Sequence, residues 1–223
     1  VKYTFYKMMP EWRHLGEEFR LEAKVEFTEV VDQFRSKLTI RSYSLMGMRA
    51  DAEMMIWLVS SDLESIQDLA VRLAKTKLGS YMTISHSYLA MPRHSIYVDE
   101  HTQTHHQGAD RTKIVPMNSP YLFVYPFLKS HAWYQLSAHE RQEMMKEHFT
   151  IGHKYPDVKI HTSYSYGIDD QEFVLGFETD NPPQFLDLVM ELRHSIQRPY
   201  TERDTPIFTC LLRPLQGVLE NLA

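Results

Sequence analysis

Residues 42–73 read SYSLMGMRADAEMMIWLVSSDLESIQDLAVRL, and residues 163–192 read SYSYGIDDQEFVLGFETDNPPQFLDLVMEL. Both stretches open with Ser-Tyr-Ser and continue into a turn that contains a glycine. Beyond the turn, identical residues recur at an offset of 119: Asp51, Glu53, Asp68, Leu69 and Leu73 fall on Asp170, Glu172, Asp187, Leu188 and Leu192. Self-similarity at a fixed spacing is the signature of an internal duplication.

The two copies lie within the same predicted order of elements. Apolar residues alternate where strands are expected and recur every three or four positions where helices are expected. In the first half we expect strands at 2–9, 37–48, 53–60 and 81–89, and helices at 10–33 and 62–79. In the second half we expect strands at 121–126, 159–166, 172–179 and 206–212, and helices at 137–154 and 182–195. Asp62 and a capping box at Ser137–Glu140 mark two of the helix starts.

Each half therefore has the order β-α-β-β-α-β, which predicts an α+β fold with a duplicated ferredoxin-like subunit. The helices of such a unit cover one face of its sheet, and we expect the two bare faces to bury each other in a dimeric α+β barrel. Residues 92–120 are polar and contain three prolines and four histidines, which is typical of a connection. We place the N-terminal half at 1–115 and the C-terminal half at 116–223.

Composition narrows the function classes. The 223 residues include 24 basic and 29 acidic side chains, so the net charge is −5 and no general positive field favours nucleic acid or an anionic membrane. No apolar run is long enough to span a bilayer, and the first residues lack the pattern of a signal peptide. Cys210 is the single cysteine, which excludes an internal disulfide or a Cys-based metal centre. We expect a reducing, cytoplasmic location.

His148 is the first candidate for chemistry. Met144, His148, Ile151 and Tyr155 recur at spacings of four, three and four, so the imidazole lies on the apolar face of its predicted helix. An inward histidine is either a hydrogen-bonded core residue or a ligand. No CxxC, HExxH or carboxylate cluster surrounds it, so a metal there would need its other ligands from outside the protein. Heme supplies four nitrogens and needs one axial histidine, and it meets that requirement.

The stretch YLFVYPFLK at 121–129 is the second candidate. Tyr125 shares one face of the predicted strand with Phe123 and Phe127, and Lys129 ends the run. Two interpretations stay open: an aromatic core strand followed by a solvated lysine, or a tyrosine facing a redox cofactor with the lysine paired to an acidic group. The chain has no GxGxxG, phosphate-loop or GxSxG motif, which disfavours the familiar nucleotide enzymes and serine hydrolases.

The second half also contains a set of short motifs. They are FVYPFLK at 123–129, WY at 133–134, ER at 140–141, MMKEH at 144–148, YPDV at 155–158 and GIDD at 167–170. In this set the chain resembles the chlorite dismutase superfamily, and within it most closely the actinobacterial-type coproheme decarboxylases. Residues 49–69 and 194–214 are similar to the same family, so the resemblance covers nearly the whole chain.

The resemblance implies a heme cofactor, with iron coproporphyrin III as substrate and cofactor at once, bound in the C-terminal half of a homopentamer. It implies that His148 is the axial ligand, which agrees with the argument from the helix face. It also implies that Tyr125 forms a radical and that Lys129 binds a propionate. The expected partners are the porphyrin and hydrogen peroxide, without nucleic acid or membrane insertion.

Other site residues follow from position within the resemblance. Arg111, fourteen residues before Tyr125, matches an arginine of the family by spacing. The connecting loop offers His105 or His106 as the distal base, and Trp133 of the WY motif is expected beside the cofactor.

Ile160 distinguishes this chain from the chlorite-degrading members of the superfamily. Those enzymes place an arginine seven residues before the glycine that is Gly167 here. An aliphatic side chain cannot supply the charge that organises an oxychlorine anion, so chlorite dismutation is disfavoured.

The expected function is that of a heme-binding oxidoreductase, a hydrogen peroxide-dependent heme synthase. It would decarboxylate two propionates of iron coproporphyrin III to vinyl groups and so produce heme b. Two alternatives stay open: a heme peroxidase or chlorite dismutase-like detoxifying enzyme, and a non-catalytic heme carrier or sensor in which Tyr125 is only a core aromatic residue.

Overall fold

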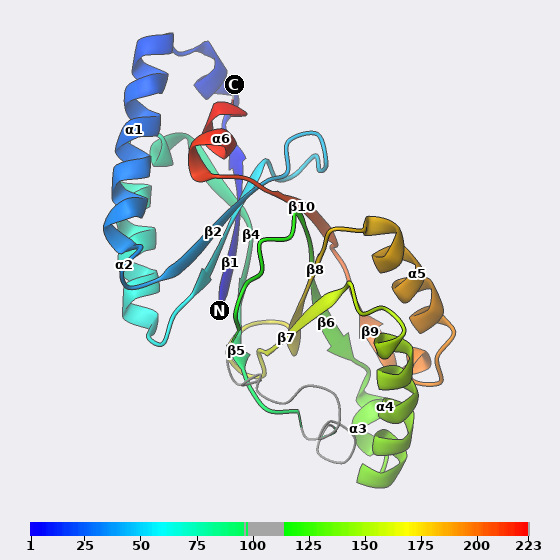
Figure 1. Ribbon diagram of the computed structural model, residues 1–223. Helices are drawn as coiled ribbons and strands as arrows, with labels where there is room; N and C mark the ends of the chain where they lie inside the picture. The colour runs from blue at the N-terminus through cyan, green and yellow to red at the C-terminus, as the bar shows by residue number, and fades with distance from the viewer. Residues whose placement is uncertain (96, 98–113, 223) are drawn as a thin grey trace. The chain divides into compact units, whose positions relative to one another are not determined.

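The computed structural model describes residues 1–95, 97 and 114–222, and it divides the chain into two compact units. Unit 1 comprises Val1–Leu89 and Phe208–Ala223, and unit 2 comprises Ala90–Ile207 (Figure 1). The expected halves of 1–115 and 116–223 differ from these units because the C-terminal sixteen residues, 208–223, belong with the first unit. His105, His106 and Arg111 lie outside the described residues.

Unit 1 is built on an antiparallel sheet with the strand order β4-β1-β3-β2-β10. Its strands are β1 (Lys2–Met8), β2 (Thr39–Ser44), β3 (Met54–Val59), β4 (Met82–Leu89) and β10 (Phe208–Leu212). Its helices are η1 (Pro10–His14), α1 (Glu17–Phe34), α2 (Leu63–Ala74), η2 (Gly79–Tyr81) and α6 (Leu215–Glu220). The order β4-β1-β3-β2 is that of a ferredoxin-like unit, as predicted.

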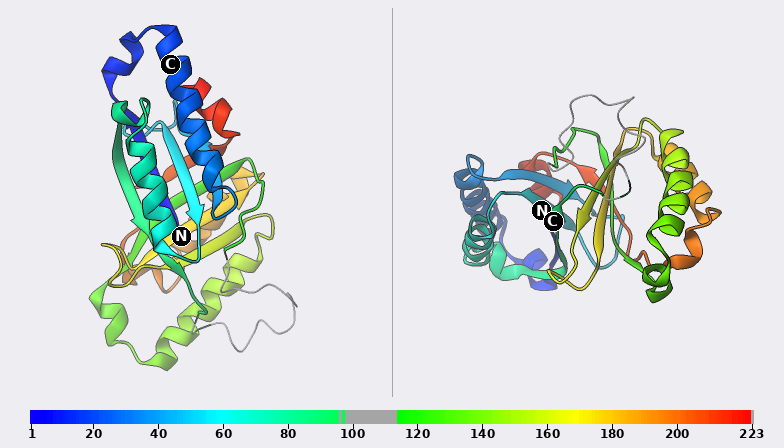
Figure 2. Two further views of the ribbon diagram at one scale, coloured as in Figure 1. Left: turned by 90° about the vertical axis from the view of Figure 1, so that its left-hand side faces the viewer. Right: turned by 90° about the horizontal axis from the view of Figure 1, so that it is seen from below.

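The three α-helices of unit 1 lie on one face of its sheet (Figure 2). The Asp62 carboxylate caps α2 by accepting the Ser65 backbone N–H, as the sequence predicts. The predicted helix at 10–33 is in fact two helices, because the chain is extended at Leu15 and Gly16. The core beneath the helices takes its side chains from most of these elements, among them Met8, Trp12, Phe27, Ile40, Leu58, Leu69, Leu78, Leu215 and Val218.

Phe27 allows the contribution of this core to be measured. Its side chain is 0% exposed, so the Phe27→Ala substitution removes buried aromatic surface and leaves a cavity. We expect a loss of about 3–5 kcal/mol in the free energy of unfolding, read from urea denaturation followed by circular dichroism. Leu21→Ala on the same helix is the matched control: Leu21 is 63% exposed, and its truncation should change stability by less than about 0.5 kcal/mol. Equal losses in the two variants would contradict this core assignment.

Unit 2 repeats the design around β6 (Tyr121–Lys129), which pairs with β8 (Phe173–Thr179), which in turn pairs with β7 (Lys159–Tyr164). The remaining elements are β5 (Met91–Pro92), α3 (His131–Gln135), α4 (Ala138–His153), α5 (Pro182–Arg193), η3 (Arg198–Tyr200) and β9 (Thr201–Arg203). The capping box predicted at Ser137 and Glu140 is present at the start of α4. Helices α4 and α5 pack on each other and lie on one face of this sheet (Figure 1).

The hairpin quoted from the sequence has the same hydrogen bonds in both units. Glu53 accepts the Met8 backbone N–H at 2.8 Å, and Glu172 accepts the Lys129 backbone N–H at 2.8 Å. Each turn contains a glycine with positive φ, 77° at Gly47 and 67° at Gly167, a conformation that side chains with a Cβ rarely adopt. The duplication predicted from the sequence is therefore present at the level of individual backbone contacts.

The strand predicted at 206–212 is present as β10, at Phe208–Leu212, where it pairs with β2 of unit 1. A further strand of three residues, β9, was not predicted and pairs with β6. Pro206 has no N–H to donate, so pairing along this stretch cannot continue through it. Strand β9 ends at Arg203, before Pro206, and strand β10 begins at Phe208.

Candidate active site

Three polar side chains meet inside unit 2. The Lys129 ammonium group donates a hydrogen bond to Oε1 of Gln197, and Nε2 of Gln197 lies 3.3 Å from Nδ1 of His148. Lys129 ends β6, Gln197 precedes η3 and His148 lies on α4, so three separate elements bring this trio together. Lys129 and Gln197 are buried and His148 is partly exposed.

The duplication shows which residues the trio replaces. The matching hydrogen bonds to Glu53 and Glu172 align Met8 with Lys129, and the same offset of 121 aligns Phe27 on α1 with His148 on α4. The bonds Met9 N–H to Tyr81 O and Ser130 N–H to Tyr200 O, both 2.8 Å, align η2 with η3.

That second alignment places Leu78 at the position of Gln197. Met8, Phe27 and Leu78 all belong to the apolar core of unit 1. A buried polar group costs free energy unless it is hydrogen-bonded, so the three polar side chains of unit 2 depend on the contacts among them. An arrangement of this kind is typical of a functional site.

The electrostatics of the trio keep the imidazole neutral. Burial, and then the positive charge of Lys129, lowers the pKa of His148 from 6.5 to about 4. Burial lowers the pKa of Lys129 to about 8, opposed by the carboxylate of Glu172. At neutral pH the imidazole is therefore free of a second proton, which is the state that binds a metal ion.

The tautomer of His148 decides which ring nitrogen is available to bind a metal ion. An imidazole that binds iron through Nε2 carries its proton on Nδ1 and must donate that proton. The Gln197 carbonyl oxygen has two lone pairs, so once its amide presents that oxygen it can accept from both Lys129 and His148. In the described part of the chain no group of three or more His, Cys, Asp or Glu side chains could hold a metal ion. The donor set therefore fits an iron macrocycle that brings its own nitrogens.

Trp133 contacts the trio from α3. Its buried ring lies beneath the Lys129 ammonium group, 4.2 Å from Nζ to the ring centroid, a cation–π contact. The Tyr200 ring packs at 5.8 Å from the same indole. The lysine is thus buried and not solvated, which excludes the first of the two sequence-based interpretations.

Tyr125 lies on the helix-covered face of β6 and is buried. Its ring stacks on Phe177 at a centroid distance of 5.5 Å. Burial and the negative charge of Asp204 raise the pKa of Tyr125, opposed by Arg193 and Arg198, so the phenol keeps its proton at neutral pH.

Asp204 fixes the two arginines near Tyr125. Its Oδ2 atom accepts hydrogen bonds from Nη1 of Arg193 and from Nη1 of Arg198, the latter at 2.7 Å. Both guanidinium groups are about one-third exposed. The structure places both arginines close enough to the buried Tyr125 that their charges lower its pKa.

Ile160 marks a part of the sheet face that stays open. In unit 1, Ile40 pairs with Leu58 and is 6% exposed, because α6 packs over β2. In unit 2, Ile160 pairs with Phe177 on the equivalent face and is 41% exposed. Among the described residues of unit 2 no helix takes the place of α6. This part of the sheet face, on the same side as α4, is called the open face below; it presents the apolar side chain of Ile160.

A charge change tests the electrostatics of the trio. In the protein without porphyrin, we expect Lys129→Met, which introduces the residue found at this place in unit 1, to raise the pKa of His148 above 4 but not to 6.5, because burial remains. The native state takes up this proton only near pH 4 and the unfolded state near 6.5, so stability falls as pH falls through that window. In Lys129→Met the pKa of His148 in the native state lies closer to 6.5, so the pH range over which stability falls should be narrower.

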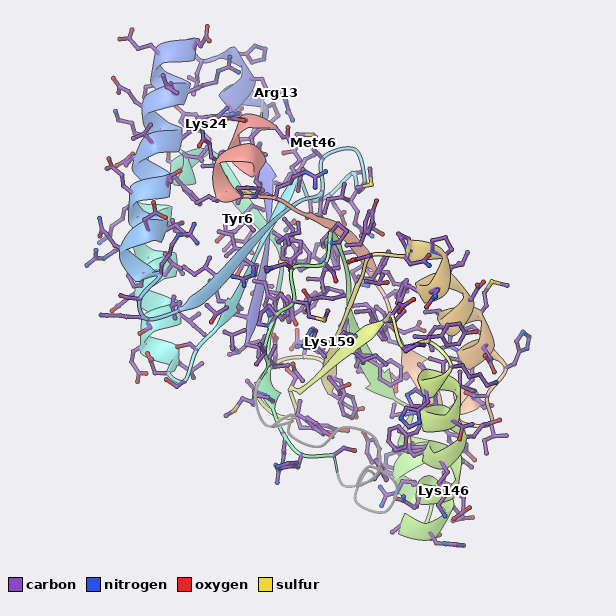
Figure 3. All side chains as sticks on the ribbon, viewed as in Figure 1. Tyr6, Arg13, Lys24, Met46, Lys146 and Lys159 are labelled. Carbon is purple, nitrogen blue, oxygen red and sulfur yellow. The ribbon has the colours of Figure 1, made fainter. Side chains whose placement is uncertain are left out.

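The measurement is an NMR titration of the His148 ring, and Lys146→Met on the exposed side of the same helix is the matched control (Lys146 is labelled in Figure 3). An unchanged His148 titration in Lys129→Met would contradict the assigned charge coupling.

The chain resembles known proteins over most of its length. The profile of the chlorite dismutase family matches residues 20–213. The coproheme decarboxylase of Mycolicibacterium smegmatis is 32% identical over 168 residues, which cover 75% of this chain and 70% of the relative. The coproheme decarboxylase of Staphylococcus carnosus is 27% identical over 207 residues, covering 86% and 82% of the two chains. A solved mutant chlorite dismutase from Candidatus Nitrospira defluvii aligns with a TM-score of 0.90 at 26% identity, over 98% of this chain and 93% of that one.

The fold and the site define a class: a duplicated ferredoxin-like α+β protein with one histidine beside an open sheet face. The chain belongs to the chlorite dismutase family, and with it to the heme-binding oxidoreductases. The predicted fold class and the predicted heme cofactor are thereby confirmed. In the described residues no helix is long and apolar enough to cross a membrane.

Of the predicted site residues, the structure brings Lys129, Trp133 and His148 together and places Tyr125 on the adjoining strand face. Sequence reasoning missed Gln197, although a signal existed: the repeat aligns this glutamine with a core leucine.

Proposed function

We propose that this chain catalyses the peroxide-dependent oxidative decarboxylation of iron coproporphyrin III to heme b. The observation that carries the proposal is the exchange of three apolar core residues for Lys129, Gln197 and His148 in unit 2 alone. The two curated relatives named coproheme decarboxylase favour this substrate over other porphyrins.

His148 would hold the iron of the bound porphyrin through Nε2. Bound iron porphyrin supplies the activation of peroxide and the removal of single electrons. The protein holds the imidazole neutral, and the Gln197 amide fixes the ring through Nδ1. The Gln197 amide oxygen, which accepts from the Lys129 ammonium group, would also accept the Nδ1 proton of His148.

Tyr125 would be the residue that takes a hydrogen atom from the substrate. A buried phenol that keeps its proton at neutral pH is a source of a hydrogen atom rather than of a phenolate. After losing an electron and its proton, Tyr125 would take a hydrogen atom from a propionate side chain. Loss of carbon dioxide and of one further electron then leaves a vinyl group.

The propionates need basic partners near the open sheet face. We assign this role to Lys129 and Arg111, with charge-assisted hydrogen bonds that contribute about 1.5–3 kcal/mol each. Arg111, like the distal-base candidates His105 and His106, lies outside the described residues. Ile160 would contact the macrocycle through its exposed apolar side chain, and it offers no charge to an oxychlorine anion.

The finer setting of the enzyme belongs to the same proposal. We infer a homopentamer in the cytoplasm, with hydrogen peroxide as co-substrate and with the heme in the C-terminal ferredoxin-like half.

The test is to mix the purified protein with iron coproporphyrin III and hydrogen peroxide and to follow the porphyrin by mass spectrometry. We expect two successive losses, each of one carbon dioxide and two hydrogens. A bleached porphyrin with oxidised electron donors would instead identify a peroxidase. An unchanged porphyrin that stays bound would identify a carrier, and either result would overturn the proposal.

A further inference from the structure

Two tyrosines on the surface of unit 2 share a hydrogen bond. Tyr134 on α3 and Tyr166 in the turn between β7 and β8 have their hydroxyl oxygens 2.7 Å apart. The ring centroids are 6.5 Å apart and the planes meet at 83°. Two phenols placed end to end, with their hydroxyl groups in contact, would have a longer centroid distance than this. The two rings therefore approach obliquely, with their hydroxyl-bearing edges together.

A carboxylate lies beside the pair. Hydrogen bonding and charge from Glu172 are among the causes, after burial, that raise the pKa of Tyr134. Glu172 also accepts the backbone N–H of Lys129 at 2.8 Å. It can therefore accept the phenolic proton of Tyr134 without leaving its place in the hairpin.

The duplication supplies an internal comparison. In unit 1, Trp12 N–H bonds to Met9 O as Trp133 N–H bonds to Ser130 O in unit 2, so the next residues, Arg13 and Tyr134, are equivalent. Arg13 makes an ion pair with Glu53 at 2.7 Å. Figure 3 labels Arg13 and also Met46, which precedes the turn glycine as Tyr166 does in unit 2. The second unit has thus exchanged an ion pair and a methionine for two phenols.

Tyr134 is connected to the candidate active site through its chain neighbour. Trp133 precedes it on the short helix α3, and the Trp133 ring lies beneath the Lys129 ammonium group. On the other side of the pair, the Tyr166 ring packs edge-on against Phe173 at 5.1 Å. Indole and phenol rings are the side chains most readily oxidised by one electron, so oxidising equivalents at the site have aromatic side chains along the route to Tyr134.

We propose that Tyr134 and Tyr166 are a site of oxidative modification, coupling to dityrosine when the heme-loaded protein consumes hydrogen peroxide. The inference rests on the proposed function only for its oxidant. Each phenol loses one electron and its O–H proton, the proton of Tyr134 passing to Glu172, and the two radicals join through a carbon–carbon bond between ortho positions.

The two ortho hydrogens then leave as protons, and both hydroxyl groups are restored. The two electrons and two protons reduce one hydrogen peroxide to two waters, so two tyrosines and one peroxide give one dityrosine and two waters. Because the pair is 36% and 46% exposed, the reaction would move oxidative damage from the buried site to the surface.

The experiment treats the full chain, loaded with iron coproporphyrin III, with excess hydrogen peroxide. We expect dityrosine fluorescence, a protein mass lower by two hydrogens and a crosslinked peptide that joins Tyr134 to Tyr166. Tyr134→Phe and Tyr166→Phe should each abolish this crosslink. Tyr155→Phe is the matched control, because Tyr155 also donates to a carboxylate, that of Glu191 at 3.0 Å, and it should leave the crosslink in place.

A second arm separates this inference from the proposed function. Protein without porphyrin is oxidised by light, tris(bipyridine)ruthenium and persulfate, which needs no heme. A crosslink in both arms supports the inference, even if the porphyrin in the first arm is not decarboxylated. A crosslink only with ruthenium overturns it, because the two phenols can then couple but are not oxidised through the bound porphyrin. A crosslink in neither arm also overturns it and shows that the hydroxyl contact only joins α3 to the hairpin. Decarboxylation is read from the porphyrin mass in the same samples, so the two proposals succeed or fail separately.

Discussion

His148→Ala should remove the iron ligand while leaving the fold in place. We expect iron porphyrin affinity to fall by more than about a hundredfold, because loss of a ligand should cost at least as much as loss of the outer contacts that orient it. The absorbance and resonance Raman signatures of an iron–imidazole bond should disappear. His148, the counterpart of Phe27 in unit 1, is partly exposed. Its truncation to alanine therefore leaves the apolar core of Ile151 and Leu188 in place.

Two comparisons separate lost ligation from lost structure. His153→Ala changes an exposed histidine in the last turn of the same helix and should leave the spectrum unaltered. Added imidazole should restore the iron–imidazole bands in His148→Ala if the only defect is the missing ring. If the alanine variant keeps the native spectrum without imidazole, the iron ligand is another residue and the arrangement around Gln197 has some other purpose.

The periodicity of apolar residues made much of this site predictable. Helical spacing alone placed His148 on the inward face of its helix, and alternation placed Tyr125 on one face of its strand with Phe123. Both inferences depend on local periods, which are short enough to be visible in one sequence. The structure places both side chains accordingly, His148 toward Gln197 and Tyr125 toward Phe177.

Gln197 and Lys129 show where periodicity stops being informative. Gln197 is buried but lies in an irregular stretch after α5, 49 residues from the imidazole that it contacts. No local pattern marks such a residue, and only alignment of the repeats with Leu78 would have shown a polar side chain in a core position. The environment of Lys129 could not be predicted either, because it depends on Trp133, which α3 brings under the ammonium group.

The last strand was predicted as an element, but its partner was not. Residues 206–212 alternate as a strand should, and the prediction of an extended segment was confirmed at Phe208–Leu212. Its partner was not predictable, because alternation fixes which residues share a face and not which edge they join. The short strand β9, with only three residues, has too few positions to show any alternation.

Tyr125→Phe should stop decarboxylation and leave porphyrin binding intact. Phenylalanine retains the ring that stacks on Phe177 at 5.5 Å, so the packing of the strand is kept. What is lost is the O–H group, and with it the hydrogen atom that the proposed reaction takes from the protein. We expect the rate of carbon dioxide loss to fall by about a hundredfold or more, the range seen when a positioned proton-transfer group is removed. Affinity for iron coproporphyrin III should change by less than about threefold, which is about half of 1.4 kcal/mol, because phenylalanine retains the ring contacts.

Tyr121→Phe is the matched control, because Tyr121 lies on the same strand and packs against the same core without a place in the proposed chemistry. Its decarboxylation rate should equal that of the unaltered protein. Freeze-quenched samples should show a tyrosyl radical signal in the unaltered protein and in Tyr121→Phe that is diminished in Tyr125→Phe. If Tyr125→Phe decarboxylates at the full rate, the buried phenol is a core residue only, and hydrogen transfer from the propionate must proceed without it.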